Sequence, residues 1–151
     1  ARLVGSEMCI RDRAVGEERI LRVWPFREAI DAGGLVVAGS DWAVVPSVNP
    51  WLAVEAMVTR EEPGGSEKSF GKPQAITVTE AIDIFTTNAA KHMGNEYRLG
   101  QIASGFLADL VVTDQNPYET TATDLHKTKV LMTFIGGEKV YDAKDRPGSG
   151  R

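Results

Sequence analysis

Apolar residues along this chain gather in short runs, and the first clear run ends in an acid. Residues 35–38 read Leu-Val-Val-Ala and are followed by Gly39, Ser40 and Asp41. An uncharged, Val-rich run that follows the glycine pair at 33–34 predicts a strand buried on both faces. In parallel α/β folds the carboxyl ends of such strands carry the chemistry, so Asp41 is a candidate functional residue. The alternative role for an acid at this place is to cap a helix or form a turn.

Helices are predicted on both sides of this strand. Residues 24–33 contain a proline near the start, apolar residues at helical spacing and a glycine at the end. After a long loop, Asn49 and Pro50 offer an N-cap and a first-turn proline for a helix over residues 51–60. The order helix, strand, long loop and helix indicates a βα unit of a parallel sheet, with its loop on the side of Asp41.

A pair of helices is predicted further along. Residues 77–80, Thr-Val-Thr-Glu, form a capping box. The helix that it opens carries an apolar stripe made of Ala81, Ile82, Ile84, Phe85 and Ala89. An interruption at 86–88 starts a second short helix that ends at Gly94. The breaker-rich stretch 61–75 is expected to be either a mobile linker or a loop that faces substrate.

From Gly100 the pattern changes to short β runs. They lie at residues 109–113, 130–135 and 138–141. The Gly136-Gly137 pair between the last two runs is a strong hairpin signal, because both turn positions then tolerate positive φ.

Composition limits what the chain can contain. It is 42% hydrophobic and 25% charged with a net charge of -4, so no basic excess favours a nucleic-acid partner. No apolar run approaches the roughly 20 residues needed to cross a bilayer, and we expect neither nucleic acid nor membrane as a partner. The single cysteine excludes an internal disulfide framework. The 151 residues are too few for a whole TIM barrel, which takes about 250 residues.

The first residues fit nothing that follows them. Residues 5–13, Gly-Ser-Glu-Met-Cys-Ile-Arg-Asp-Arg, resemble a translated sequencing-adapter tract. We therefore expect residues 1–13 to be an adapter-derived or disordered arm, in which Cys9 is not a natural residue. The alternative is an ordinary solvated N-terminal arm. The segment lacks the apolar core of a secretory signal but tells nothing about export, and a cytoplasmic location is the working expectation.

Several motifs, in a consistent order, resemble the metal-dependent amidohydrolases. The resemblance is to the amidohydrolase 3 family, which includes N-substituted formamide deformylases, and it covers residues 14–142. The matching motifs are Glu18-Arg19, Trp24-Pro25-Phe26-Arg27, Asp31-Ala32-Gly33, Gly39-Ser40-Asp41-Trp42, Thr59-Arg60, Glu80-Ala81, Thr86-Thr87-Asn88-Ala89-Ala90, Gly100-Gln101-Ile102-Ala103-Ser104-Gly105 and Ala108-Asp109-Leu110-Val111-Val112. Two positions depart from the family, since Phe106 stands where a lysine is common and Ala43 where a proline is common.

The resemblance implies an α/β fold that is only part of an enzyme. This would be the C-terminal portion of a (β/α)8 TIM-like barrel plus part of a small β-sandwich. Residues 14–95 would hold the last barrel βα unit and the following helices, and residues 96–142 the C-terminal part of the sandwich. Residues 143–151 would be a frayed tail. The partner strands would come from parts of the enzyme that precede this chain.

The resemblance also implies a chemistry. The family hydrolyses non-peptide C–N bonds of small-molecule amides, such as N-acyl or N-formyl amines, with water activated by a divalent metal. Zinc is the expected metal, as one or two ions. Asp41 matches the aspartate that contacts the metal, takes the proton from the bound water and passes it to the leaving amine. The family's His-x-His pair, two further histidines and carboxylated lysine are not in this chain, so we expect it to be inactive alone.

Other candidate residues and other classes of function are weaker. We expect His92 and His126 to have surface or capping roles, and Arg60 to be a helix C-terminal charge rather than a substrate contact. Residues 39–41 lack the second glycine of a serine-hydrolase elbow, and no dinucleotide or phosphate-binding glycine motif follows the predicted strand. The remaining alternative is a non-catalytic binding or interaction module derived from an amidohydrolase tail.

Overall fold

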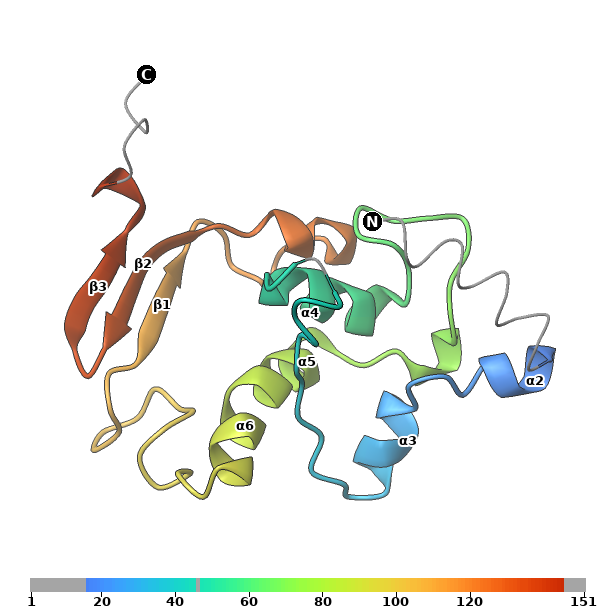
Figure 1. The fold of residues 1–151 in the computed structure, drawn as a ribbon, viewed down its shortest axis with the longest axis horizontal. Coiled ribbons are helices and arrows are strands. Elements are labelled where there is room, and N and C mark those ends of the chain that lie inside the picture. Colours follow the sequence, from blue (N-terminus) through green and yellow to red (C-terminus); the bar gives the residue numbers. More distant parts are fainter. Residues whose placement is uncertain (1–15, 46, 146–151) are drawn as a thin grey trace.

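The computed structural model describes residues 16–45 and 47–145. Helices occupy the middle and one end of the molecule, and a small sheet occupies the other end (Figure 1). The α-helices are α2 (Glu17–Ile20), α3 (Phe26–Asp31), α4 (Pro50–Thr59), α5 (Val78–Phe85) and α6 (Thr87–His92). The strands are β1 (Leu110–Thr113), β2 (Val130–Ile135) and β3 (Glu138–Asp142), and the 3-10 helices are η1 (Lys72–Gln74), η2 (Ala122–Lys127) and η3 (Ala143–Asp145). The predicted arm at 1–13 and the end of the predicted tail, 146–151, lie outside the described residues.

The core lies between α4, α5 and η2. Its buried members are Val54, Met57, Ile76, Ala81, Ile84 and Leu125. Ala81 and Ile84 belong to the stripe predicted for α5, and both are fully buried together with Leu125. Because η2 follows β1 in the chain and packs on α4, it joins the sheet to the helices. We call α4, α5, α6 and η2 the helical body.

The predicted caps of α4 and α5 are confirmed. The Trp51 N–H donates to Asn49 Oδ1 at 3.1 Å. The Glu80 N–H donates to Thr77 Oγ1 at 3.2 Å, and the Thr77 N–H donates to Glu80 Oε2 at 2.8 Å. These bonds satisfy backbone donors that a helix start leaves unpaired, which is why the local sequence predicts both helix starts well.

The sheet is a three-stranded antiparallel meander in the order β1-β2-β3. Gly136 and Gly137 form the predicted hairpin turn, with φ values of 58° and 86°. No residue of these three strands is buried. Val111 and Ile135 are 58% and 59% exposed. The sheet is therefore correctly paired along its strands but has no apolar layer packed over it within the described residues.

The predicted strand at 35–38 is wrong for this chain. These residues have no regular secondary structure, and none has a strand partner among residues 16–45 and 47–145. Leu35 is 44% exposed, whereas Val36 and Ala38 pack against the edge of the core. The run is held by Asn88, whose Nδ2 donates to the Val36 carbonyl oxygen at 3.0 Å. A strand needs a neighbour for its N–H and C=O groups, and the described residues supply none.

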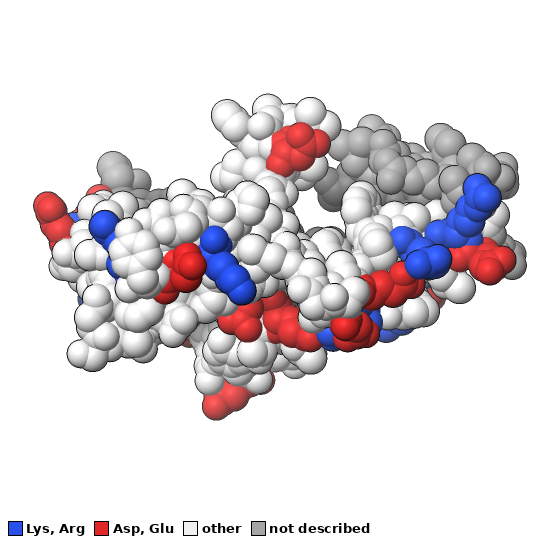
Figure 2. Space-filling view, turned by 90° about the horizontal axis from the view of Figure 1, so that it is seen from below, with Lys and Arg blue, Asp and Glu red and all other residues white. Residues whose placement is uncertain are grey.

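Charges are mixed on the face shown in Figure 2, where Lys and Arg side chains lie among Asp and Glu side chains. None of the helices in the described part of the chain has the length and apolar character needed to cross a bilayer.

Candidate functional site

Asp41 begins a tight turn directly after the apolar run. Its backbone is left-handed, with φ of 51°, a conformation that Asp and Asn tolerate better than most residues. The Asp41 carbonyl oxygen accepts from the N–H groups of Val44 and Val45 at 2.8 and 3.1 Å. The Trp42 N–H donates to Ser40 Oγ at 3.3 Å. The turn fixes the backbone while leaving the Asp41 side chain exposed.

The described residues do not form a metal site around Asp41. Its carboxylate makes no hydrogen bond or ion pair with any described residue, and no cluster of three or more His, Cys, Asp or Glu side chains occurs among them. A catalytic zinc needs about three protein ligands. The donor set of the described residues therefore does not by itself fit the metal that the family resemblance implies, and further ligands would have to come from elsewhere in the protein.

His126, for which we expected a surface or capping role, is partly buried and packs against a fully buried acid. Glu55 on α4 has no exposed surface. Its Oε2 lies 2.7 Å from both the backbone N and the ring Nδ1 of His126, and its Oε1 accepts from the Gly64 N–H at 2.6 Å. Glu55 thus joins α4 to η2 and to the loop after α4. His92, in contrast, is exposed at the end of α6, as expected.

Arg60 is buried rather than a simple surface charge at a helix end. It is 5% exposed, and burial lowers the pKa of its guanidinium. Its Nε donates to the Phe70 carbonyl oxygen at 2.9 Å and its Nη2 donates to the Val23 carbonyl oxygen at 2.7 Å. The guanidinium also lies 5.6 Å from the ring centre of Phe26. These hydrogen bonds connect Arg60, at the end of α4, to the segment before α3 and to the loop after α4.

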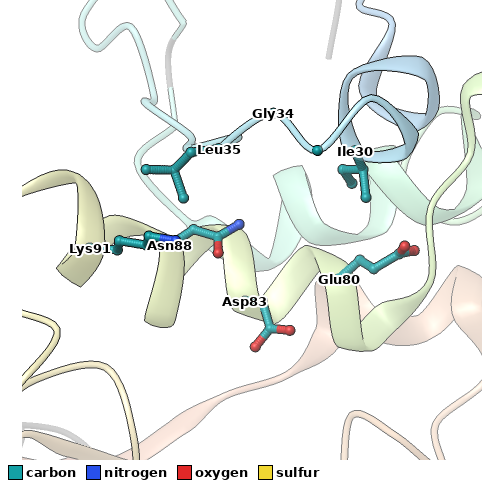
Figure 3. A pocket seen from close by; sticks show the side chains of 8 residues that line it. Ile30, Gly34, Leu35, Glu80, Asp83, Asn88 and Lys91 are labelled. Atoms are coloured by element: carbon teal, nitrogen blue, oxygen red, sulfur yellow. The ribbon is translucent and has the colours of Figure 1, made fainter.

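A separate pocket lies between the end of α3 and the helices α5 and α6 (Figure 3). It measures about 310 Å³ and is lined by Ile30, Gly33, Gly34, Leu35, Glu80, Asp83, Asn88 and Lys91. Asp41 is not among these residues, so the pocket does not complete a site around it. Two of the polar groups are already engaged, since Glu80 pairs with Arg27 and Asn88 holds Val36.

Comparison with known proteins gives a consistent family match. The family model described as the amidohydrolase family matches residues 3–141. The Bacillus subtilis protein YtcJ, which is named as an amidohydrolase, is 30% identical over 131 residues, or 85% of this chain and 24% of that protein. N-substituted formamide deformylase of Arthrobacter pascens is 30% identical over 125 residues, or 81% of this chain and 22% of the relative.

Two further matches agree. LONG AFTER FAR-RED 3 of Arabidopsis thaliana is 28% identical over 130 residues, or 85% of this chain and 22% of that protein. The crystal structure of an amidohydrolase from Thermotoga maritima has a TM-score of 0.58 and 23% identity, and the match covers 78% of this chain and 25% of that chain. The chain thus spans about a quarter of the length of the curated relatives that it matches.

Proposed function

Since this chain belongs to the amidohydrolase family, we propose that it is the C-terminal part of a hydrolase for non-peptide C–N bonds. The substrates would be small-molecule amides such as N-formyl or N-acyl amines. The similarity to N-substituted formamide deformylase supports this substrate class. The single observation that carries the proposal is an exposed Asp41 at the end of an apolar run that has no strand partner among the described residues.

The proposal also explains which surfaces are incomplete. In the complete enzyme, residues 35–38 would be the last strand of a TIM-like barrel, within a barrel portion at 14–95. The sheet within 96–142 would be part of a β-sandwich whose facing layer lies elsewhere in the enzyme. Both assignments are supported by the missing strand partners of the run and by the absence of buried residues in β1, β2 and β3. The chain's share of its relatives' length leaves room for these parts.

Asp41 would serve the reaction as a ligand and a proton carrier. Hydrolysis joins the water oxygen to the carbonyl carbon and breaks the C–N bond, so one proton must travel from water to the leaving nitrogen. A carboxylate within reach of both atoms can accept that proton and release it again. We propose this role for Asp41, together with contact to a divalent metal, zinc being the candidate. Because the described residues offer too few ligands, the other ligands would come from the rest of the enzyme.

A direct assay tests the proposal. The 151-residue chain and the complete enzyme that contains it are purified with added zinc and tested on N-formyl and N-acyl amines. The complete enzyme should hydrolyse at least one substrate, and the chain alone should show no turnover above a zinc blank. Comparable turnover by the two proteins would contradict the proposal.

One observation favours a second candidate function. The helical body has its own buried core around Ile84 and Leu125, which is the property expected of a free-standing binding or interaction module. A complete gene that has no His-x-His motif before this segment would favour that module over the enzyme.

A further inference from the structure

The turn after Asp41 exposes several large apolar side chains next to one acid. Trp42 is 68% exposed, Val44 73%, Val45 45% and Val48 63%. Exposed apolar residues scattered singly need no explanation, but a group of them on a single loop is typical of a surface that another molecule or chain covers.

Backbone hydrogen bonds keep this group beside the acid. Because Val44 and Val45 both donate to the Asp41 carbonyl oxygen, the chain from Asp41 to Val45 is a closed turn rather than a loose loop. The Ser40 hydroxyl accepts from the Trp42 N–H and fixes the entry to the turn. The backbone of residues 42–45 therefore stays folded against Asp41 whatever covers the turn.

The chemistry of the turn favours a small substrate over a packed protein layer. A protein layer packed over Trp42 and Val44 would also cover the exposed Asp41 carboxylate. The proposed role requires this carboxylate to stay open to the substrate. Ligand sites, in contrast, are mostly apolar with a few polar groups that orient the ligand, and this turn has that composition. Loops at the carboxyl ends of barrel strands also face the substrate in TIM-barrel enzymes.

We propose that Trp42 and Val44 form the apolar wall of the substrate site and select amides with an apolar substituent on the nitrogen. This inference rests on the proposed function of Asp41. If Asp41 returns the proton to the leaving nitrogen, then the nitrogen side of the substrate faces the turn, and its substituent lies against the indole. The selected class is N-alkyl or N-aryl amides, in preference to amides with a small or polar amine.

Two substrates and three variants of the complete enzyme test this inference. The substrates are N-butylformamide and N-methylformamide, which differ only in apolar length at nitrogen. We expect Trp42→Gln to lower the butyl-to-methyl ratio of kcat/KM at least about 10-fold, the scale of lost methylene contacts in an apolar pocket. Trp42→Phe should keep the ratio within about 3-fold, because the ring remains. Val44→Thr, which has nearly the same shape, should lower the ratio a few fold even if Trp42→Gln does not fold.

Trp24→Gln is the matched control. Trp24 is also an exposed tryptophan, at 57%, but it belongs to the segment between α2 and α3, outside the Asp41 turn, and contacts Phe70. The butyl-to-methyl ratio of kcat/KM in Trp24→Gln should equal that of the unchanged enzyme. An unchanged ratio in both Trp42→Gln and Val44→Thr would overturn this inference while the hydrolase proposal stands. If the complete enzyme hydrolyses no N-formyl or N-acyl amine at all, both proposals are overturned.

Discussion

Two apolar runs of similar composition reach different states in this molecule. Val130–Ile135 is strand β2 and pairs on one side with β1 and on the other with β3. The run at residues 35–38 has no regular secondary structure and pairs with no strand in the described chain. The difference lies in where the partner comes from. A Gly136-Gly137 turn returns the chain next to β2, whereas the neighbours of a parallel strand must come from distant parts of the sequence.

An apolar β pattern is therefore not enough to give a sheet. For a hairpin the partner is local, so the two strands can pair within this chain. For a parallel strand the partners are remote, and such a run stays unpaired unless they are present.

The largest expected effect lies at Asp41, directly after the unpaired run. Asp41→Asn in the complete enzyme should lower kcat by at least about 10²-fold, since a general acid or base contributes on that scale. Asparagine tolerates the φ of 51° as well as aspartate does, so the change tests the carboxylate and not the turn. Steady-state kinetics give the answer. Asp31→Asn, which alters an exposed acid paired with Arg27, should keep near-normal kcat, and near-normal kcat in Asp41→Asn would remove Asp41 from the mechanism.

The next effect is on the stability of the helical body. Val36 and Ala38 of the unpaired run pack against its core, and η2 joins it to the sheet that contains the paired run. Glu55→Ala should lower the free energy of unfolding of the 151-residue chain by about 2 kcal/mol, because it leaves the N–H groups of Gly64 and His126 without their acceptor. Urea denaturation measures the change. The control Glu138→Ala, at an exposed acid of β3, should stay within about 0.5 kcal/mol of the unchanged chain. A loss of unfolding free energy in Glu55→Ala no larger than that of the control would show that the hydrogen bonds of Glu55 contribute nothing to stability.

A smaller effect is expected in the paired run alone. Gly137→Ala places a side chain at φ of 86° and should cost the hairpin about 1 kcal/mol. Hydrogen exchange of β2 and β3 should speed up, while exchange in α4 and α5 should not change. An added Cβ would meet only Ala108, at 3.9 Å, so backbone strain and not a clash is the cause. Unaltered exchange in β2 would mean that the turn does not hold the pairing.

The smallest effect is a pH dependence at the helix that supports the unpaired run. The Thr77 N–H, with a further contribution from Arg27, lowers the pKa of Glu80, and Arg27 lies on α3, which leads into the run. A lowered pKa means that the contribution to stability is present above the ordinary glutamate pKa and is lost as pH falls through the folded value. Between about pH 6 and pH 3, the unchanged chain should lose more stability than Glu80→Gln. Equal losses would contradict this assignment.

What the sequence predicts well is local. The N-cap Asn49, the capping box of Thr77 and Glu80 and the Gly136-Gly137 turn each depend on residues a few positions apart, and all are found as predicted. The position of Asp41 after an apolar run is also visible in the sequence. Its role in catalysis stays a prediction, because the groups that would complete the site are not among the described residues.

What the sequence does not reveal is contact at long range. Glu55 and His126 are 71 positions apart, and the only hint is a single acid within the apolar helix that ends at Thr59. Arg60 likewise donates a hydrogen bond to the Val23 carbonyl oxygen, 37 positions earlier. Its side chain therefore connects distant segments rather than only placing a charge at a helix end. The missing pairing of residues 35–38 has the same origin, since a strand depends on a neighbour that local patterns do not supply.

Amide hydrogen exchange at residues 35–38 tests the central claim most directly. It is measured in the 151-residue chain and in the complete enzyme under the same conditions. We expect exchange close to that of an unstructured peptide in the chain alone and at least about 100-fold slower exchange in the complete enzyme, where remote strands would pair with the run. Equal exchange rates for these amides in the two proteins would contradict it.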